Sequence, residues 1–301
     1  MTIKRFLDLV RAPFFTGVIV PVILGAVIAW HAGYPFLWGY FLLTLLGIVA
    51  IHAGANTIND YFDHLSRNDE LNTEFVRPFS GGSRAIQNNT IAAKHMLVLS
   101  LSLYSVGIVI GIFLAASRGM PIFWIGLAGV GIGVLYVMPV INLAGRGFGE
   151  LGILVAFGVL CVQGSYVVQA QNMAWEPLLL SLPVGLLITA VLWINEFPDF
   201  NADKAVGKHH LVVRLGKQKA VKVYVFLMAL TYVLIALFAL IYNLWLLLSL
   251  IMVPKVYKIC RHALANYENT EALIPANAGT IIAHLTTGLL MAAGYVLDRL
   301  L

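Results

Sequence analysis

Residues 36–63 read FLWGYFLLTLLGIVAIHAGANTINDYFD, and this stretch decides the fold class. Its first part, residues 36–51, contains no Lys, Arg or Asp. A helix needs about 20 mostly apolar residues to cross the hydrocarbon core of a bilayer. We therefore expect a membrane-spanning helix over residues 36–58, with Asn56, Asp60 and Asp63 at one of its ends.

The same apolar pattern recurs along the whole chain. Hydrophobic residues make up 60% of the 301 positions and charged residues only 11%, whereas a soluble globular domain carries about 25% charged residues. We predict an all-α, polytopic membrane protein with about nine transmembrane helices in one bundle and cytoplasmic cap loops. Residues 1–301 are expected to form a single membrane-embedded domain. The nine spans are expected near residues 12–32, 36–58, 96–117, 121–141, 149–170, 177–197, 220–242, 244–260 and 276–297.

The distribution of basic residues predicts the orientation in the membrane. Of the 19 Lys and Arg residues, all but Arg118 and Arg299 fall at the N-terminus or after the even-numbered spans. Cytoplasmic loops carry the excess of Lys and Arg, so the N-terminus and these loops are expected in the cytoplasm, with the chain in the cell membrane. The net charge of +5 then suits an anionic lipid leaflet and requires no nucleic-acid partner.

Two polar clusters occur at the cytoplasmic ends of expected spans. Asn56 precedes Asp60 by four residues, and Asn195 precedes Asp199 by four residues. Positions four apart share a helix face, and acidic groups at a membrane helix end usually mark function. The repeated spacing indicates two related halves that face one shared site. Because Pro198 removes a backbone hydrogen bond, we expect the second helix to kink or break just before Asp199.

These oxygen-rich clusters predict a magnesium site. Mg²⁺ prefers oxygen ligands and usually takes one or two carboxylates, with water and phosphate oxygens completing its shell. Two facing groups of carboxylates can hold metal ions on a diphosphate between them. The predicted ligands are Asp60, Asp63, Asp199, Asp203, Asn56 and Asn195.

Basic and aromatic side chains near the clusters fit the same ligand. Arg suits bidentate phosphate contact, and Arg67, Arg84, Lys208 and Arg214 lie in the loops that follow the two clusters. The alternative is that these residues only satisfy the topology, as most cytoplasmic Lys and Arg do. Tyr136 lies about one turn from the cytoplasmic end of its span, where its ring can stabilise a carbocation or simply occupy the interface.

The motifs resemble the signatures of the UbiA superfamily of intramembrane prenyltransferases. The resemblance is carried by Asn56-Thr-Ile-Asn-Asp-Tyr-Phe-Asp63 and Asp199-x-x-x-Asp203, and it implies nine spans with a cytoplasmic cap over the site. Within the superfamily the chain is most similar to the 1,4-dihydroxy-2-naphthoate polyprenyltransferases, the MenA type. That similarity is carried by Ser80-Gly-Gly-Ser-Arg-Ala-Ile-Gln87, Arg146-Gly-Phe-Gly-Glu150 and residues 207–216, whereas Asn195-Glu-Phe-Pro-Asp199 departs from the Asn-Asn-x-Arg-Asp of well-known MenA enzymes.

The resemblance implies a magnesium-dependent transfer of a polyprenyl group from its diphosphate to an aromatic acceptor, which for the MenA type is 1,4-dihydroxy-2-naphthoate in menaquinone biosynthesis. Mg²⁺ and basic side chains would neutralise the diphosphate, the allylic C–O bond would ionise, and an electron-rich acceptor carbon would capture the cation; in MenA-type chemistry the acceptor also loses CO₂. The partners would be the two substrates and the lipid bilayer, with no obligate protein partner evident. The catalytic residues would be Asp60, Asp63, Asp199, Asp203 and Tyr136, and the substrate-binding residues Asn56, Arg67, Arg84, Arg146, Asn195, Lys208 and Arg214.

Other functions stay open at this point. Other branches of the superfamily use 4-hydroxybenzoate, geranylgeranylglyceryl phosphate, haem or chlorophyll acceptors. A cation or metabolite transporter would also carry intramembrane acids, but transporters place their sites near the bilayer midplane, and both clusters here are expected at cytoplasmic ends. A CDP-alcohol phosphotransferase would carry a contiguous Asp-Gly-x-x-Ala-Arg core, which the sequence lacks.

Overall fold

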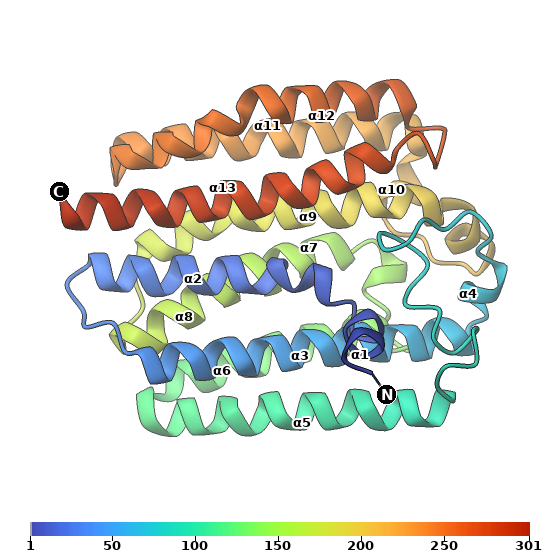
Figure 1. Cartoon of the computed structure of the whole chain (residues 1–301), viewed down its shortest axis with the longest axis horizontal. Coiled ribbons are helices and arrows are strands. Elements are labelled where there is room, and N and C mark those ends of the chain that lie inside the picture. The colour runs from blue at the N-terminus through green and yellow to red at the C-terminus, as the bar shows by residue number, and fades with distance from the viewer. Residues whose placement is uncertain (1) are drawn as a thin grey trace.

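In the computed structural model, which describes residues 2–301, the chain folds into a bundle of long helices that run side by side (Figure 1). No strand occurs in this range, so the all-α prediction is confirmed; Met1 lies outside the described residues. The long helices are α2 (Thr16–His31), α3 (Trp38–Leu65), α5 (Ala93–Arg118), α6 (Met120–Val137), α9 (Trp175–Ala205), α11 (Lys217–Ile241) and α13 (Ile274–Leu300). The shorter segments are α1 (Ile3–Leu9), η1 (Ala12–Phe15), α4 (Asn68–Leu71), η2 (Ala144–Arg146), α7 (Gly149–Ile153), η3 (Leu154–Leu160), α8 (Cys161–Ala170), α10 (Leu211–Leu215), η4 (Leu244–Met252) and α12 (Val253–Asn266).

The number of membrane crossings agrees with the prediction of about nine. Within residues 2–301, eight helices are long and apolar enough to cross a membrane, and Gly149–Ala170, which is built from α7, η3 and α8, is one of them. The remaining expected span, residues 244–260, consists of the 3-10 helix η4 followed directly by α12, neither of which is long enough alone. The C-terminus lies at one end of the bundle and the N-terminus lies in the half toward the other end (Figure 1), which fits an odd number of crossings.

Large apolar side chains are exposed along the outer helices. Val109 on α5, Leu240 on α11 and Ile251 on η4 are between 66% and 75% exposed. Soluble monomers rarely expose extensive apolar patches, whereas the acyl chains of a bilayer cover such a surface. The chain is therefore a multi-pass membrane protein.

Helix α9 differs from the prediction at Pro198. The prediction was a kink or a break before Asp199; the helix continues through this proline to its end, so the break does not occur. Proline cannot donate to the carbonyl four residues earlier, which is that of Ile194. The buried Asn277 side chain on α13 donates to this carbonyl at 3.0 Å and to Asn195 Oδ1 at 2.8 Å. A partner from another helix thus satisfies the carbonyl that proline leaves free, and the acidic cluster stays on a helix.

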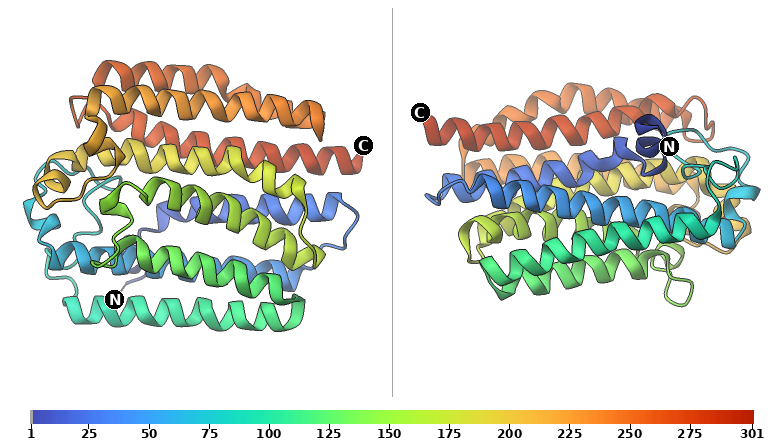
Figure 2. Two further views of the ribbon diagram at one scale, coloured as in Figure 1. Left: turned by 180° about the vertical axis from the view of Figure 1, so that it is seen from behind. Right: turned by 60° about the horizontal axis from the view of Figure 1, so that its bottom comes forward.

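Both acidic clusters lie at the same end of the bundle. Helix α3 extends to Leu65, beyond its expected end at residue 58, so the first cluster lies on its last turns. Residues 66–92, which include α4, and residues 206–216, which include α10, follow the two cluster helices and lie together at this end (Figures 1 and 2). The predicted cap loops are therefore present on one side, next to both clusters.

Candidate active site

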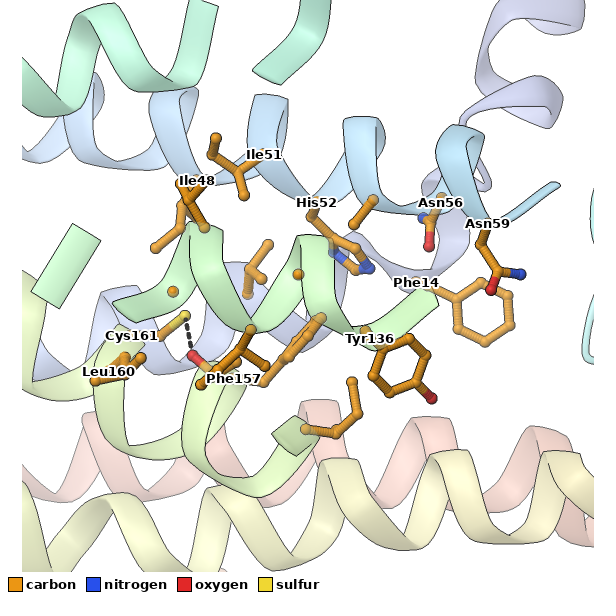
Figure 3. A pocket seen from close by; sticks show the side chains of 18 of the residues that line it. Phe14, Ile48, Ile51, His52, Asn56, Asn59, Tyr136, Phe157, Leu160 and Cys161 are labelled. Atoms are coloured by element: carbon orange, nitrogen blue, oxygen red, sulfur yellow. Dashed lines mark hydrogen bonds between the residues drawn. The ribbon is translucent and has the colours of Figure 1, made fainter. Parts of the chain in front are cut away.

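A cavity of about 520 Å³ runs inside the bundle between α3, α5, α6, η3 and α9. Its wall changes from polar to apolar along α3, from Asn59 and Asn56 to Ile51 and Ile48 (Figure 3). This wall reaches from Asp63 to Thr44, a length of about 28 Å at 1.5 Å per residue. The length of this wall is therefore comparable to the roughly 30 Å thickness of the hydrocarbon core of a bilayer.

The first cluster lies on one face of α3. His52, Asn56, Asn59 and Asp63 all line the cavity, because positions three and four apart share a helix face. Asn56 Nδ2 donates to the carbonyl of Val10 at 3.0 Å, and its amide oxygen faces the cavity (Figure 3). Asn59 donates to Asp63 Oδ2 at 2.8 Å. The helix thus presents two amides and one carboxylate at the polar end.

Asp60 is buried beside this face, with only 2% of its surface exposed. The backbone N–H of Ser83 donates to Asp60 Oδ2 at 3.1 Å, while Oδ1 has no hydrogen-bond partner among residues 2–301. A Cβ atom at Gly82 would lie 2.7 Å from Oδ1, so only glycine permits this close approach. Leaving a buried carboxylate oxygen unpaired is costly, so a cation beside Oδ1 would stabilise Asp60.

The second cluster is held in place by two amides of the segment that follows α3. Asn68 donates to Asp203 Oδ1 at 2.8 Å, and Asn72 donates to Asp199 Oδ1 at 2.6 Å. The N–H of Gly81 makes a weaker contact with Asp199 Oδ2 at 3.5 Å. The cap segment after α3 therefore ties the first half of the chain to the acidic end of α9.

Lys208 joins the two clusters directly. Its Nζ lies 2.5 Å from Asp63 Oδ1 on α3 and 3.8 Å from Asp203 Oδ1 on α9. Burial alone would lower the pKa of Lys208, but the carboxylates of Asp63 and Asp203 raise the pKa above its usual value. The ammonium group therefore stays charged at neutral pH and bridges the two helices.

Negative charge is in excess at the polar end. Asp69 is buried between the clusters, and burial together with the nearby carboxylates of Asp63 and Asp60 raises the pKa of Asp69 to about 8. A raised pKa of this kind indicates like charges that lie close together in a poorly solvated environment. Since the side chains that converge here offer mainly carboxylate and amide oxygens, they fit a hard divalent cation such as Mg²⁺.

A second group of titratable side chains forms an ion-pair network. His210 Nε2 lies 3.1 Å from Asp203 Oδ2, and His210 Nδ1 lies 3.4 Å from Glu196 Oε2. Burial would lower the pKa of His210, but the Glu196 charge and the bond to Asp203 raise the pKa to about 10. Glu150 Oε1 accepts from the N–H of Leu211 at 2.6 Å. One oxygen of Glu150, one of Glu196 and one ring nitrogen of His210 also lie within 4.8 Å of one another. The charged imidazole thus lies among carboxylates and fixes the segment after α9.

Aromatic rings surround the cavity where its polar end meets its apolar part. Tyr136 on α6 and Phe14 in η1 both face the cavity (Figure 3). His52 packs against Phe157 with ring centroids 4.8 Å apart and against Phe15 at 5.5 Å. Because the face of an aromatic ring attracts cations, this region suits a substrate that develops positive charge beside the acidic clusters.

Comparison with known proteins agrees with this geometry. The model of the UbiA prenyltransferase family matches residues 18–274. The chain belongs to the UbiA prenyltransferase family. A 2-carboxy-1,4-naphthoquinone phytyltransferase from Synechocystis is 27% identical over 98% of this chain and 94% of the relative. A 1,4-dihydroxy-2-naphthoate octaprenyltransferase from Bacillus subtilis is 27% identical over 97% of this chain and 92% of the relative.

Solved structures show the same fold. A UbiA homolog from Archaeoglobus fulgidus bound to DMAPP and Mg²⁺ matches with a TM-score of 0.63 over 95% of this chain and 99% of that chain, at 16% identity. A structure of digeranylgeranylglyceryl phosphate synthase matches with a TM-score of 0.63 over 97% and 98% of the two chains, at 20% identity. The family match and the relatives confirm the family and the enzyme class predicted from the motifs, and the protein is a prenyltransferase.

In this UbiA-family prenyltransferase, the cavity brings together most of the residues predicted for the site. Asp60 lies beside the cavity wall, as described above. The predicted residues that line the cavity are Asn56, Asp63, Tyr136, Asn195, Asp199, Asp203 and Lys208.

The four predicted arginines lie outside the cavity wall. Arg84 stacks on Phe75 at 4.1 Å from the ring centroid and donates to a backbone carbonyl, while Arg67 is exposed. Arg214 donates to the carbonyl of Arg146 at 2.8 Å, and both side chains are exposed. Arg84, Arg146 and Arg214 thus bond to backbone carbonyls of the cap, and contact of the four arginines with substrate stays a prediction.

Sequence reasoning missed several polar groups at the site. Asn59, four residues before Asp63, and the pair Asn68 and Asn72 follow the spacing that identified the clusters, so this spacing could have found them. Arg11 follows α1 with a left-handed backbone (φ 58°) and lines the cavity. Its Nε is buried without a hydrogen-bond partner among the described residues, and no motif in the sequence marks it.

Proposed function

We propose that the chain transfers the polyprenyl group of a polyprenyl diphosphate to 1,4-dihydroxy-2-naphthoate. In this proposal residues 1–301 act as one domain in the cell membrane, with the N-terminus and the cap in the cytoplasm. The observation that carries this proposal is the meeting of two acidic clusters, from α3 and α9, at the polar end of a long apolar cavity. The prenyl donor is divided in the same way as the cavity, because its diphosphate is charged and its isoprenoid tail is apolar. Both parts therefore find a matching environment in one continuous cavity.

The acidic clusters would hold Mg²⁺ on the diphosphate. Asp63, Asp199 and Asp203 line the polar end. The unpaired Oδ1 of Asp60 and the amide oxygen of Asn56 would be further oxygen ligands for the metal ion. The Archaeoglobus fulgidus homolog, which shares the fold, was solved with DMAPP and Mg²⁺. When bound, Mg²⁺ supplies the charge neutralisation that allows the diphosphate to depart.

The residues of the chain would divide the chemical step between them. As the allylic C–O bond breaks, its electron pair leaves with the diphosphate, and Lys208, next to both clusters, stabilises the departing charge. The ring of Tyr136 faces the cavity beside the clusters and stabilises the allylic cation. An electron-rich ring carbon of the acceptor then forms the new C–C bond, and the acceptor loses CO₂. The surrounding apolar wall excludes water, which would otherwise capture the cation.

The choice of acceptor is supported by the relatives. The two relatives described above are named for naphthoquinone and naphthoate acceptors, and each aligns with nearly the whole chain. Arg11 is a cation at the cavity wall in addition to Lys208, so a carboxylate-bearing acceptor can be paired while Lys208 serves the diphosphate.

A product assay tests the proposal. The purified chain in detergent, with Mg²⁺ and a long polyprenyl diphosphate, is offered 1,4-dihydroxy-2-naphthoate and 4-hydroxybenzoate in parallel, and products are identified by mass spectrometry. We expect a decarboxylated prenyl-naphthoquinol, formed without a protein partner, and no product in EDTA or from the Asp199→Asn variant. If only 4-hydroxybenzoate is prenylated, the proposed acceptor is wrong.

A further inference from the structure

Two buried glutamates and a histidine meet beside the acidic clusters. Glu150 on α7, Glu196 on α9 and His210, which comes directly before α10, are 2%, 9% and 4% exposed. One ligand atom of each residue lies within 4.8 Å of those of the other two. Three elements that are separate in the sequence thus bring two carboxylates and one imidazole together in a buried place.

Each of the two glutamates keeps one oxygen without a hydrogen bond. Glu150 Oε1 accepts from the N–H of Leu211 at 2.6 Å. Glu150 Oε2 and Glu196 Oε2 are both buried and have no hydrogen-bond partner among residues 2–301. Because a buried carboxylate oxygen without a partner is costly, one cation between these two oxygens would stabilise both glutamates.

The distance between His210 and Glu196 suits a shared metal ion better than a hydrogen bond. His210 Nδ1 lies 3.4 Å from Glu196 Oε2, beyond the range of about 2.7–3.2 Å for an N–H···O hydrogen bond. The N–H of Val213 is also 3.4 Å from Nδ1, so neither neighbour bonds closely to this nitrogen. Two ligand atoms that each lie about 2.0–2.1 Å from a tetrahedral Zn²⁺ are roughly 3.4 Å apart. The observed separation is therefore that of neighbouring ligands in a zinc site.

The other ring nitrogen of His210 is already held by a carboxylate. His210 Nε2 lies 3.1 Å from Asp203 Oδ2. Histidines that bind metals usually donate their second ring N–H to a carboxylate or a carbonyl, and this bond orients the ring and makes the ligating nitrogen more basic. Asp203 thus fills the role of that outer partner and leaves Nδ1 as the nitrogen for a metal ion.

The charges at this point also favour a divalent ion. In the described part of the chain, Glu196 has one ion pair, with His210, and Glu150 has none. One imidazolium therefore faces two buried carboxylates. A divalent ion would balance both carboxylates once the imidazole proton is released, because a histidine that binds a metal is neutral.

We propose that Glu150, Glu196 and His210 form a zinc site, separate from the oxygen ligands proposed for Mg²⁺. The imidazole nitrogen selects Zn²⁺, since Mg²⁺ prefers oxygen ligands alone. Glu196 and His210 line the cavity, so water can reach the fourth tetrahedral position. The ion ties α7 and α9 to the segment before α10 and so fixes Lys208, two residues before His210, beside the acidic clusters. The inference needs no assumption about the substrates.

Binding of Zn²⁺ to the metal-free chain tests the site. The full chain in detergent is stripped with EDTA, the chelator is removed, and Zn²⁺ is titrated calorimetrically in a large excess of Mg²⁺, which occupies the acidic clusters. We expect the wild type to bind one Zn²⁺ per chain. No binding under these conditions would overturn the inference.

Variants of the ligands locate the bound ion. Glu150→Gln keeps an oxygen for the N–H of Leu211 but loses the charge, and His210→Gln removes the imidazole. Each should weaken Zn²⁺ binding at least about tenfold, since changes even to outer partners of a metal site cost that much. His209→Gln is the matched control, because His209 is the exposed neighbour of His210, and it should bind Zn²⁺ as the wild type does. Equal affinities in His210→Gln and His209→Gln would refute the site.

Two further measurements separate this site from the acidic clusters. Asp199 is not one of the three ligands, so Asp199→Asn should bind Zn²⁺ with the affinity of the wild type, and loss of binding in this variant would place the ion at the clusters instead. In the unmodified chain, Co²⁺ in place of Zn²⁺ should give the intense visible absorption of a tetrahedral site. The weak spectrum of octahedral Co²⁺ alone would contradict the proposed ligands.

Discussion

Replacing Lys208 with Met tests how the two acidic clusters are held together. The change keeps an unbranched apolar stem but removes an ammonium that lies 2.5 Å from Asp63 Oδ1 and 3.8 Å from Asp203 Oδ1. The lysine side chain is 20% exposed, and the two carboxylates are 12% and 9% exposed. Breaking a buried ion pair costs about 3–5 kcal/mol. The lower end applies because Asn59 and Asn68 still donate to the same carboxylates.

We therefore expect Lys208→Met to lower the free energy of unfolding by about 3 kcal/mol, roughly a hundredfold in the unfolding equilibrium constant. Mg²⁺ should offset much of this loss, because a cation at 100 times its Kd stabilises the folded state by about 2.7 kcal/mol. Thermal unfolding in detergent, in EDTA and in Mg²⁺, measures both effects. Lys204→Met is the matched control, since Lys204 is exposed on the last turn of α9.

Two results would refute this reasoning. If Lys208→Met unfolds at the wild-type temperature in EDTA, the bridge between α3 and α9 contributes nothing. If Mg²⁺ raises the unfolding temperatures of the wild type and the variant by the same amount, the ammonium and the cation do not share the same carboxylates.

Three further predictions test the catalytic clusters, the support of α9 and the topology. Asp60→Asn and Asp199→Asn should each lower kcat at least about a hundredfold in folded protein, because each removes charge from the diphosphate site; near-normal turnover in either variant would remove that residue from the mechanism. Asn277→Ala should lower the free energy of unfolding by about 1–3 kcal/mol, since it unpairs a buried carbonyl, and an unchanged thermal unfolding curve would contradict the role assigned to it. Single cysteines at Ser66 and Ala205 in a cysteine-free background should react with an impermeant thiol reagent only from the cytoplasmic side, and labelling from outside would reverse the predicted orientation.

The membrane helices could be predicted because their signal is local. The apolar run of α3 and the acids after it were both visible within residues 36–63. The predicted end at residue 58 was too early, because hydropathy falls where the polar face begins, while the backbone hydrogen bonds of α3 continue to Leu65. The same continuation places Asn59 and Asp63 on one helical face that lines the cavity, although the sequence motif had not singled out Asn59.

Of the kink or break expected at Pro198, the break does not occur, for a reason that no local rule contains. Proline frees the carbonyl of Ile194, and the group that satisfies it, Asn277, lies on a helix near the other end of the chain. An asparagine in an apolar span is an unusual and costly residue. The presence of Asn277 in an apolar span could have indicated that its side chain has a hydrogen-bond partner, but the sequence does not show which helix carries that partner.

The basic residues of the cap show the same limit. Lys208 and Arg214 occur in one short loop and carry the same charge. The fold turns Lys208 toward the carboxylates and uses Arg214 to hold the carbonyls of Arg146 and His209. Charge and spacing therefore selected the right loops, while only the tertiary structure separates a cation of the site from a cation that braces the cap.

Helix α3 explains how one element serves both ends of an amphiphilic substrate. Its cavity face carries Asp63, Asn59 and Asn56 at the cap and Ile48 and Thr44 at the far end. Helix α9 likewise contributes acids at the cap and aliphatic side chains beyond it. Because the polar and apolar parts of this face follow one another along a single rigid helix, the helical rise sets the distance between the diphosphate site and the apolar wall for the donor tail. Substitutions at the cap end of this face should therefore change diphosphate chemistry, while those beyond Asn56 should change the preference for the donor tail and leave metal binding intact.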